Sequence, residues 1–371
     1  MHEAGRLKVV HFVTGGFSGA TQVAADLTRA AHAAASMQAV LVLRRKRSTS
    51  IQRVQALRAE GLQVELVPGW PHAVTVWALA RLCRRLRPDV LIAHGFPEHL
   101  LGRWAGLIAG VPHLVQVEHN AKERYTPLRL AQARWLAKHT DRIVGVSEDV
   151  RDIVVSLGMP ADKVVAIPNG IRLERFADAD DIAFDQREPG LVMAARFAGQ
   201  KDHATLLRAL HRLRAAGLTP KLLLAGTGGN RHERAARALC AELGLGDQVQ
   251  FLGHIGDLPK LLMRHRIAVL SSHYEGFGLA LAEGMAAGCA AIGTNAPGIR
   301  TLIDDGVDGL LVQHEEPDSL ANAIARCLRD TQLAGNLARA GRARALAQFS
   351  RDTMHARYET LLHEVAAKAP R

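Results

Sequence analysis

Aromatic residues, cysteines and long apolar runs are all scarce in this chain of 371 residues. Aromatic side chains make up only 4% of it, and there is no RNA-binding or helix-turn-helix signature, so we expect no nucleic-acid partner. No apolar run reaches the roughly 18 residues that a membrane-spanning helix needs. The apolar stretch at residues 7–13 is short and lacks a cleavage site, so we also expect no signal peptide.

The cysteines are few and widely spaced. They are Cys83, Cys240, Cys289 and Cys327. The cysteine ligands of a metal site usually lie in pairs a few positions apart in the sequence, and these four cysteines do not. We therefore interpret the four residues as reduced thiols of a cytoplasmic protein.

Positive charge is concentrated in the first half of the chain. The net charge is +11, and residues 1–171 carry 22 Lys and Arg against 13 Asp and Glu, a net +9. A nucleic acid, an anionic membrane surface or an anionic acceptor could each explain this excess, and so could a generally arginine-rich composition. With 48% hydrophobic and 22% charged residues, the chain is typical of a folded protein and is long enough for two domains.

Two segments supply much of this basic charge. Residues 44–47 read Arg-Arg-Lys-Arg at the end of an expected strand. The second segment is a helix expected at residues 74–87, which contains Trp77 with Arg81, Arg84, Arg85 and Arg87. Such a helix can rest on the anionic inner face of the cytoplasmic membrane, with Trp77 at the headgroup level. Alternatively, its basic face is simply solvated.

Expected strands and helices alternate along both halves, which predicts parallel sheets covered by helices. The strands are predicted at residues 7–13, 39–43, 63–67, 90–93, 113–117, 142–146, 164–167, 191–195, 222–225, 249–252 and 267–270, and a turn with a last strand at 305–312. Helices are predicted at residues 21–35, 74–87, 99–109 and 279–287, and three more close the chain.

Residues 271–288 carry the strongest chemical signal. A buried strand leads into a loop with Glu275, Gly276 and Gly278, and Glu283 follows eight residues after Glu275 inside the next helix. The glycines let the backbone approach a ligand closely, and the helix start offers free N–H groups to a phosphate. Two carboxylates here can accept hydrogen bonds from sugar hydroxyls, although acids near helix starts are also common because they complement the helix dipole.

This stretch resembles the Glu-x7-Glu segment of the retaining family 4 glycosyltransferases, whose fold is called GT-B. The resemblance is carried by the run Glu275 to Leu279 and by the Ala-Glu-Gly-Met-Ala-Ala-Gly that contains Glu283. It implies an α/β fold of two Rossmann-like domains with parallel sheets that face a central cleft. It places the acceptor domain at residues 1–172, the donor domain at 188–348, and a helix at 349–371 that packs back on the first domain. We interpret residues 178–190 as the linker.

The resemblance also implies roles for individual residues. Glu283 matches the ligand of the ribose and Glu275 the ligand of the donor sugar, while Arg196 and Lys201 match the pair that clamps the diphosphate. The other implied donor-binding residues are Gly15, Gly16, Gly226, Ile255, Gly276, Phe277, Gly278 and Leu279. His119 matches the active-site histidine at the reacting centre, and His94, after the preceding strand, is the competing candidate. The acceptor-binding residues stay unknown.

The implied reaction moves a sugar from a nucleotide-diphosphate sugar to a hydroxyl with retained anomeric configuration. No cofactor and no metal is implied, since Arg196 and Lys201 can stabilise the leaving phosphate. A UDP-sugar is slightly favoured over a GDP-sugar, and the acceptor is expected to be lipid-linked or anionic, in polysaccharide or lipopolysaccharide assembly. The alternatives are a nucleotide-sugar 2-epimerase on the same fold and a non-enzymatic nucleic-acid-binding protein.

Overall fold

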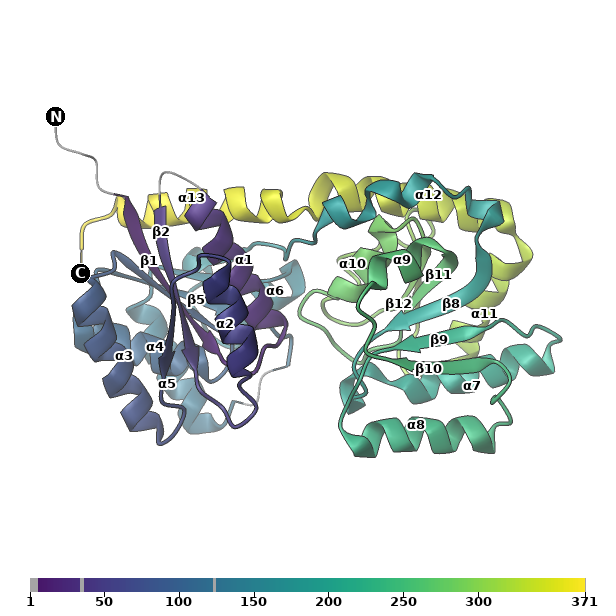
Figure 1. Ribbon diagram of the computed structural model, residues 1–371, viewed down its shortest axis with the longest axis horizontal. Helices are drawn as coiled ribbons and strands as arrows, with labels where there is room; N and C mark the ends of the chain where they lie inside the picture. Colours follow the sequence, from purple (N-terminus) through teal and green to yellow (C-terminus); the bar gives the residue numbers. More distant parts are fainter. Residues whose placement is uncertain (1–5, 34–36, 123–124, 371) are drawn as a thin grey trace. The chain divides into compact units, whose positions relative to one another are not determined.

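The computed structural model describes residues 6–33, 37–122 and 125–370. The chain forms two compact units (Figure 1). Unit 1 comprises Met1–Asn169 with Asp352–Arg371, and unit 2 comprises Gly170–Arg351. In the described ranges, no helix combines the length and the apolar character that crossing a bilayer requires.

Unit 1 is built on seven parallel strands in the order β3-β2-β1-β4-β5-β6-β7. The strands are β1 (Leu7–Thr14), β2 (Met37–Arg44), β3 (Val64–Val67), β4 (Val90–His94), β5 (His113–Glu118), β6 (Arg142–Gly145) and β7 (Val164–Ala166). The helices are α1 (Gly19–Ala33), α2 (Ile51–Ala59), α3 (His72–Leu86), α4 (Glu98–Ala109), α5 (Pro127–Lys138) and α6 (Glu148–Ser156). The central strands are almost continuous runs of buried apolar residues, as expected where helices cover both faces of a sheet.

Alternate residues of β2 show how the two faces are covered. Val40 and Val42 pack in a core with α3 and α4, whereas Leu41 and Leu43 pack in a core with α1 and α2. Successive side chains of a strand point to opposite faces, so these two cores lie on opposite sides of the sheet. In Figure 1, α3 and α4 accordingly flank the strands of unit 1 on one side, and α1 and α2 on the other.

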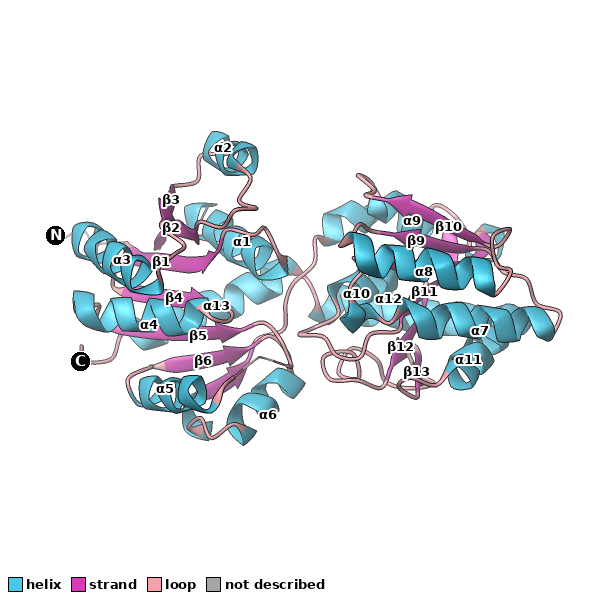
Figure 2. Cartoon of the chain, turned by 90° about the horizontal axis from the view of Figure 1, so that it is seen from below, coloured by secondary structure: helices cyan, strands magenta, loops and turns pink. Residues whose placement is uncertain are grey.

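Unit 2 contains a six-stranded parallel sheet in the order β10-β9-β8-β11-β12-β13. Its strands are β8 (Glu188–Ala194), β9 (Leu222–Ala225), β10 (Val249–Gly253), β11 (His265–Leu270), β12 (Ala290–Thr294) and β13 (Leu310–Val312). Its helices are α7 (His203–Ala215), α8 (Asn230–Glu242), α9 (Leu258–Met263), α10 (Leu279–Ala286), α11 (Pro317–Arg329) and α12 (Thr331–Gln348). Figure 2 shows the strands of each unit in magenta between cyan helices.

The last helix, α13 (Arg351–Ala366), belongs to unit 1 from Asp352 onward. Its apolar face is buried, and Tyr358, Leu361 and Leu362 lie on it. A helix that starts at the end of unit 2 therefore contributes core residues to unit 1.

Most predicted elements are present, with ends shifted by up to three residues. The structure differs from the expectations in two places. The predicted linker at residues 178–190 contains part of the short helix η2 (Leu173–Asp180), the short helix η3 (Phe184–Gln186) and the start of β8. Strand β12 was not predicted, because three of the five residues in its sequence Ala-Ala-Ile-Gly-Thr are alanine or glycine, which are depleted in strands. The final residues of the helix predicted at 21–35, positions 34 and 35, lie outside the described residues.

Candidate functional site

The loop between β11 and α10 is the first part of the candidate site, and its backbone is held in place. Glu275 N donates to Pro297 O at 2.8 Å, and Thr294 Oγ1 donates to Ser272 O at 2.6 Å. Gly298 has φ +76°, and a Cβ there would lie 2.3 Å from Glu275 O. Only glycine fits at that position, so the loop after β12 supports the loop that carries Glu275.

Gly278 forms the junction between this loop and α10. It is the N-cap residue of the helix, with the left-handed φ of +77°, and it makes no side-chain cap. The first N–H groups of a helix have no partner within it, so the start of α10 keeps donors for an anion. Phe277 points elsewhere: it is buried and its ring meets Phe349 edge to face at 5.4 Å. Phe277 therefore anchors the loop, and its backbone is what remains available to a ligand.

The structure brings Lys201 and Glu275 into direct contact. Lys201 Nζ donates to Glu275 Oε1 at 2.5 Å, and both side chains are largely buried, with 14% and 10% exposed. Lys201 comes from the loop after β8 and Glu275 from the loop after β11, and these two strands are neighbours in the sheet. The residues predicted to clamp the diphosphate and to bind the sugar thus form one ion pair at the carboxyl edge of the sheet, where α/β proteins bind ligands.

Further hydrogen bonds join the same two loops. Gln200 Nε2 donates to Tyr274 O at 2.7 Å, and His273 N donates to Gln200 O at 2.8 Å. Ser271 Oγ is within hydrogen-bond distance of Lys201 O and of Asp202 O, at 3.2 and 3.0 Å. Gln200 was not predicted, since a glutamine in a loop carries no signal of its partner. These contacts fix the position of the Lys201 and Glu275 side chains.

Glu283 lies half-buried on α10. Burial raises the pKa of its carboxyl group, and Arg175 and Arg172 offset part of that rise. Both arginines follow the Pro-Asn-Gly-Ile turn at residues 168–171. They were missed because nothing in the local sequence links them to a helix more than a hundred positions later. The surroundings of Glu283 are therefore apolar and positively charged, which suits a carboxylate that binds hydroxyl groups.

The remaining predicted residues of unit 2 are Arg196, Gly226 in the loop after β9 and Ile255 in the loop after β10. Arg196 is exposed and makes no ion pair with the residues that the structure describes. Position 226 has room only for glycine, because a Cβ there would lie 2.1 Å from Ala195 O. Ile255 is half-buried just after β10. The structure does not bring Arg196 into contact with Glu275, so a joint role with Lys201 stays a prediction.

A group of histidine and acidic side chains lies beside the Lys201–Glu275 pair. His273 Nδ1 is 2.8 Å from His314 Nε2 and 3.3 Å from Glu315 Oε1. Within the described part of the chain, these three residues are the ones close enough to share a metal ion. Glu315 is exposed. Asp202 Oδ2 lies 3.9 Å from His273 Nδ1, while Asp202 Oδ1 accepts from Thr205 N and so caps α7.

In unit 1, the two predicted glycines differ in their surroundings. A Cβ on Gly15 would lie 2.7 Å from both Arg44 O and Thr49 Oγ1, so the loop itself requires glycine there. Gly16 is exposed, and a Cβ would meet nothing closer than 3.6 Å. Close packing therefore explains Gly15 without a ligand, whereas Gly16 is free to approach one.

The two candidate histidines are hydrogen-bonded to each other. His94 Nδ1 lies 3.1 Å from His119 Nε2. His94 is fully buried, whereas His119 is only partly buried at the end of β5. Of the two, His119 is therefore the residue that can reach a ligand. Burial lowers the pKa of His119 to about 3, so its ring is uncharged at neutral pH.

The basic segments of unit 1 are only partly exposed. Arg44 is buried and pairs with Glu98 at 2.8 Å, so it does not contribute to a basic surface as the sequence suggested. The remaining residues 45–47 are exposed, and so is one face of α3. On that face Val74 and Trp77 are 42% and 61% exposed.

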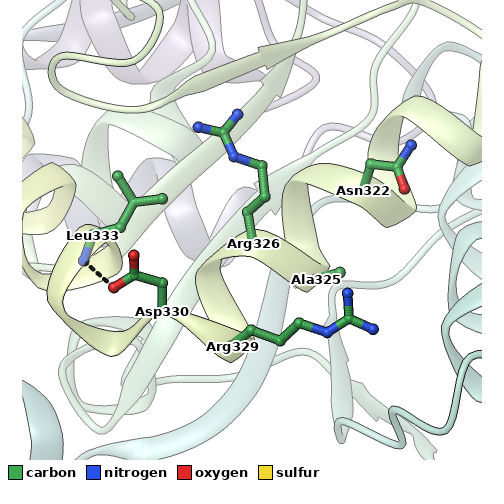
Figure 3. Close-up of a pocket in the computed structure, with 6 residues that line it drawn as sticks. All are labelled: Asn322, Ala325, Arg326, Arg329, Asp330 and Leu333. Atoms are coloured by element: carbon green, nitrogen blue, oxygen red, sulfur yellow. Dashed lines mark hydrogen bonds between the residues drawn. The ribbon is translucent and has the colours of Figure 1, made fainter.

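A surface hollow elsewhere on unit 2 contains none of the predicted site residues. It is lined by Asn322, Ala325, Arg326, Arg329, Asp330 and Leu333, where α11 meets α12 (Figure 3). Asp330 Oδ1 accepts from Leu333 N at 2.8 Å and thereby caps α12, and the two arginine side chains extend in different directions (Figure 3). We assign no chemistry to this hollow.

Comparison with known families finds a match for each half of the chain. Residues 17–175 match the profile "Glycosyltransferase Family 4", and residues 174–344 match "Glycosyl transferases group 1". Among curated relatives, the Escherichia coli UDP-Gal:alpha-D-GlcNAc-diphosphoundecaprenol alpha-1,3-galactosyltransferase is 26% identical over 69% of this chain and 70% of its own length. The Rhizobium meliloti lipopolysaccharide core biosynthesis glycosyltransferase LpsE is 28% identical over 76% of this chain and 77% of its own.

The fold is also found in solved structures. Anabaena Alr3699/HepE, crystallised in complex with UDP and glucose, superposes with a TM-score of 0.83 at 21% identity. The match covers 97% of this chain and 100% of the other. The similarity therefore extends over both Rossmann-like units.

Proposed function

Because the chain is a glycosyltransferase of the GT-B type, we propose that it transfers a sugar with retained configuration during assembly of a cell-envelope polysaccharide or lipopolysaccharide. Its donor is a nucleotide-diphosphate sugar, with UDP favoured over GDP, and its acceptor offers a hydroxyl group. The names of the two curated relatives support this class of reaction, and the HepE complex supports UDP. The relatives give no support to the alternative of a 2-epimerase.

The observation that carries the proposal is the ion pair of Lys201 and Glu275. Lys201 has three N–H donors, so it can keep its bond to Glu275 and still donate to the donor diphosphate. Glu275 has acceptor capacity left for hydroxyls of the transferred sugar. Arg196 adds a second positive charge, and Glu283 accepts from the ribose.

In the proposed reaction, the bond between the sugar anomeric carbon and the diphosphate oxygen breaks. The acceptor oxygen forms its bond to the same face of that carbon, and its proton passes to the leaving phosphate oxygen. Lys201 and Arg196 stabilise the negative charge that develops on the leaving group, so no metal ion takes part in the transfer. His119 hydrogen-bonds at the reacting centre as an uncharged ring.

We also propose that unit 1 binds an anionic membrane surface, where a lipid-linked acceptor would be found. Val74 and Trp77 are exposed near the start of α3, and Arg81 and Arg84 follow at helical spacing on the same exposed face. The Arg81 guanidinium lies 5.7 Å from the Trp77 ring centroid. An apolar patch beside basic side chains is what a helix at a membrane interface presents.

The test of the donor is a thermal-shift screen with UDP-, GDP- and ADP-sugars. We expect a UDP-sugar to raise the unfolding temperature most. The protein is then incubated with that donor and a sugar-diphosphate-prenol acceptor, and the anomeric proton coupling of the product is read by NMR. A product of inverted configuration would contradict retention, and the lack of a thermal shift with every donor would contradict the proposed donor class.

A further inference from the structure

Three histidines from neighbouring strands form a continuous row inside unit 1. His11 lies on β1, His94 ends β4 and His119 follows β5. His11 Nδ1 is 3.0 Å from His94 Nε2, and His94 Nδ1 is 3.1 Å from His119 Nε2. The ring centroids are 5.3 and 5.4 Å apart. His11 and His94 are buried, and His119 is the partly exposed member.

The atoms in contact restrict where the ring protons can be. A neutral imidazole has one N–H donor and one acceptor nitrogen, and His94 uses one nitrogen toward each neighbour. If His94 carries its proton on Nε2, it donates to His11 and must accept from the Nε2–H of His119. If the proton is on Nδ1, it donates to His119 and must accept from the Nδ1–H of His11. In either case all three rings are protonated on the same kind of nitrogen.

The surroundings keep these rings uncharged. Burial lowers the pKa of His11 and of His119 to about 3. Burial lowers the pKa of His94 well below its ordinary value, and the two neighbouring rings lower it further. The row is therefore a set of neutral hydrogen bonds at neutral pH, not a set of charges.

We propose that His94 and His11 are positioning residues that fix the tautomer of His119. His119 uses Nε2 in the row, so Nδ1 is its remaining polar atom. The shared tautomer decides whether that Nδ1 donates to a ligand or accepts from one. The inference rests on the proposed role of His119 at the reacting centre, but the coupling itself is a property of the three rings.

The direct test is NMR of the wild-type protein labelled with ¹⁵N in its histidine rings. The two neutral tautomers give different shifts for Nδ1 and Nε2, and single His→Phe variants assign the signals. We expect His11, His94 and His119 to be neutral at pH 7 and to share one tautomer, either all Nε2–H or all Nδ1–H. Unlike tautomers within the row, or a charged member at pH 7, would overturn the proposal.

Kinetics of His94 variants test the consequence for catalysis. His94→Phe keeps a planar ring but removes the hydrogen bond to His119, so we expect kcat to fall by about ten- to a hundredfold, as for partners that orient a metal-ligating histidine. His94→Gln can both donate and accept, and we expect it to restore part of that loss. The KM for the donor should stay unchanged, because His94 is fully buried and is not among the residues expected to bind the donor. The exposed His32→Gln serves as the matched control.

The outcomes separate this proposal from the proposed function. If His119→Ala keeps full kcat, the role of His119 in transfer is wrong, whatever the tautomers are. If His119→Ala is inactive but His94→Phe, shown by circular dichroism to be folded, keeps full kcat, then the positioning role is wrong and the proposed function stands.

Discussion

The first unit has the larger net charge, but the charged candidate residues lie at the strand ends of the second unit. Residues 1–171 hold +9 of the +11 net charge. Yet the candidate residues at the strand ends of unit 1 are neutral histidines, beside the compensated pair of Arg44 and Glu98. Unit 2 is nearly balanced overall, and its strand ends carry the Lys201–Glu275 pair.

The comparison shows that the net charge of a unit reports its exterior, not its site. The basic residues of unit 1 are exposed on α3 and in residues 45–47, where they can act only on a surface or a large partner. The Lys201–Glu275 pair of unit 2 is largely buried, where each charge acts strongly on a bound ligand. This arrangement suits a unit 2 that binds a charged donor and a unit 1 whose site recognises hydroxyl groups.

The largest effect is expected from Glu275→Gln, which removes the negative charge of the carboxylate and keeps the size of the side chain. We expect kcat to fall by about a hundred- to a thousandfold, as for other losses of a preorganised electrostatic group. Release of UDP from the donor, measured in single turnovers, checks this value. Glu316→Gln, an exposed acid of the same unit, is the control. An equal kcat in both variants would show that the ion pair is only structural.

Loss of donor affinity is the next effect in size. Lys201→Ala and Glu283→Ala should each weaken binding of the nucleotide diphosphate by about 1–3 kcal/mol, because each removes a partly buried charged hydrogen bond. Calorimetric titration with UDP measures this, with the exposed Lys260→Ala as the control. Unchanged affinity in both variants would show that Lys201 and Glu283 do not bind the donor.

Many residues of the candidate site were predicted from the sequence, and the signal that pointed to them differs between the units. In unit 2 the residues from Glu275 to Glu283 are contiguous, so their family resemblance was visible, and the structure adds that Glu275 meets Lys201. In unit 1 the row of histidines is dispersed over more than a hundred positions. His119 was identified and His94 was taken as its competitor, but His11 was missed. Only the adjacency of β1, β4 and β5 brings the three rings into hydrogen-bond distance of one another.

Membrane binding tests the role of the exposed basic residues of unit 1. If the exposed basic residues of unit 1 face a membrane, each contributes about 1 kcal/mol near an anionic surface, and salt screens this attraction. The protein should sediment with phosphatidylglycerol vesicles at low salt but not at high salt, and Trp77→Ala with Arg81→Ala should reduce binding. Equal binding to neutral vesicles, or none to either kind at low salt, would favour a soluble acceptor.

The raised pKa of Glu283 predicts a small effect on stability. The native state binds this proton more tightly than the unfolded state, so the carboxyl group favours folding at low pH and loses that contribution as pH rises through the native pKa. Glu283→Gln should therefore unfold at a higher temperature than wild type at pH 7, and the difference should shrink as pH falls toward the unfolded value of about 4.3. Thermal unfolding at several pH values checks this. A difference that is constant with pH would show that burial of the charge is not its cause.

Removal of metal ions is expected to have no effect on transfer. If the positive charges of Lys201 and Arg196 are sufficient for the leaving diphosphate, removal of divalent cations should leave transfer unchanged. The sequence contains an Asp-x-Asp pattern at residues 178–180, but Asp180 is exposed and forms an ion pair with Arg342 at 2.9 Å. Among the residues that the structure describes, the group of side chains that could hold an ion is instead His273, His314 and Glu315.

A matched variant makes this prediction decisive. Transfer is measured with and without excess EDTA, both in the wild type and in His314→Gln, which removes one of the three ligands. Equal rates in all four conditions support transfer by protein charges alone. A loss with EDTA in the wild type that manganese or magnesium restores would defeat the prediction. If that loss disappears in His314→Gln, the ion acts through the histidine group beside the donor loop. If it persists there, the ion acts on the diphosphate itself, and the charges of unit 2 are not sufficient for the chemistry.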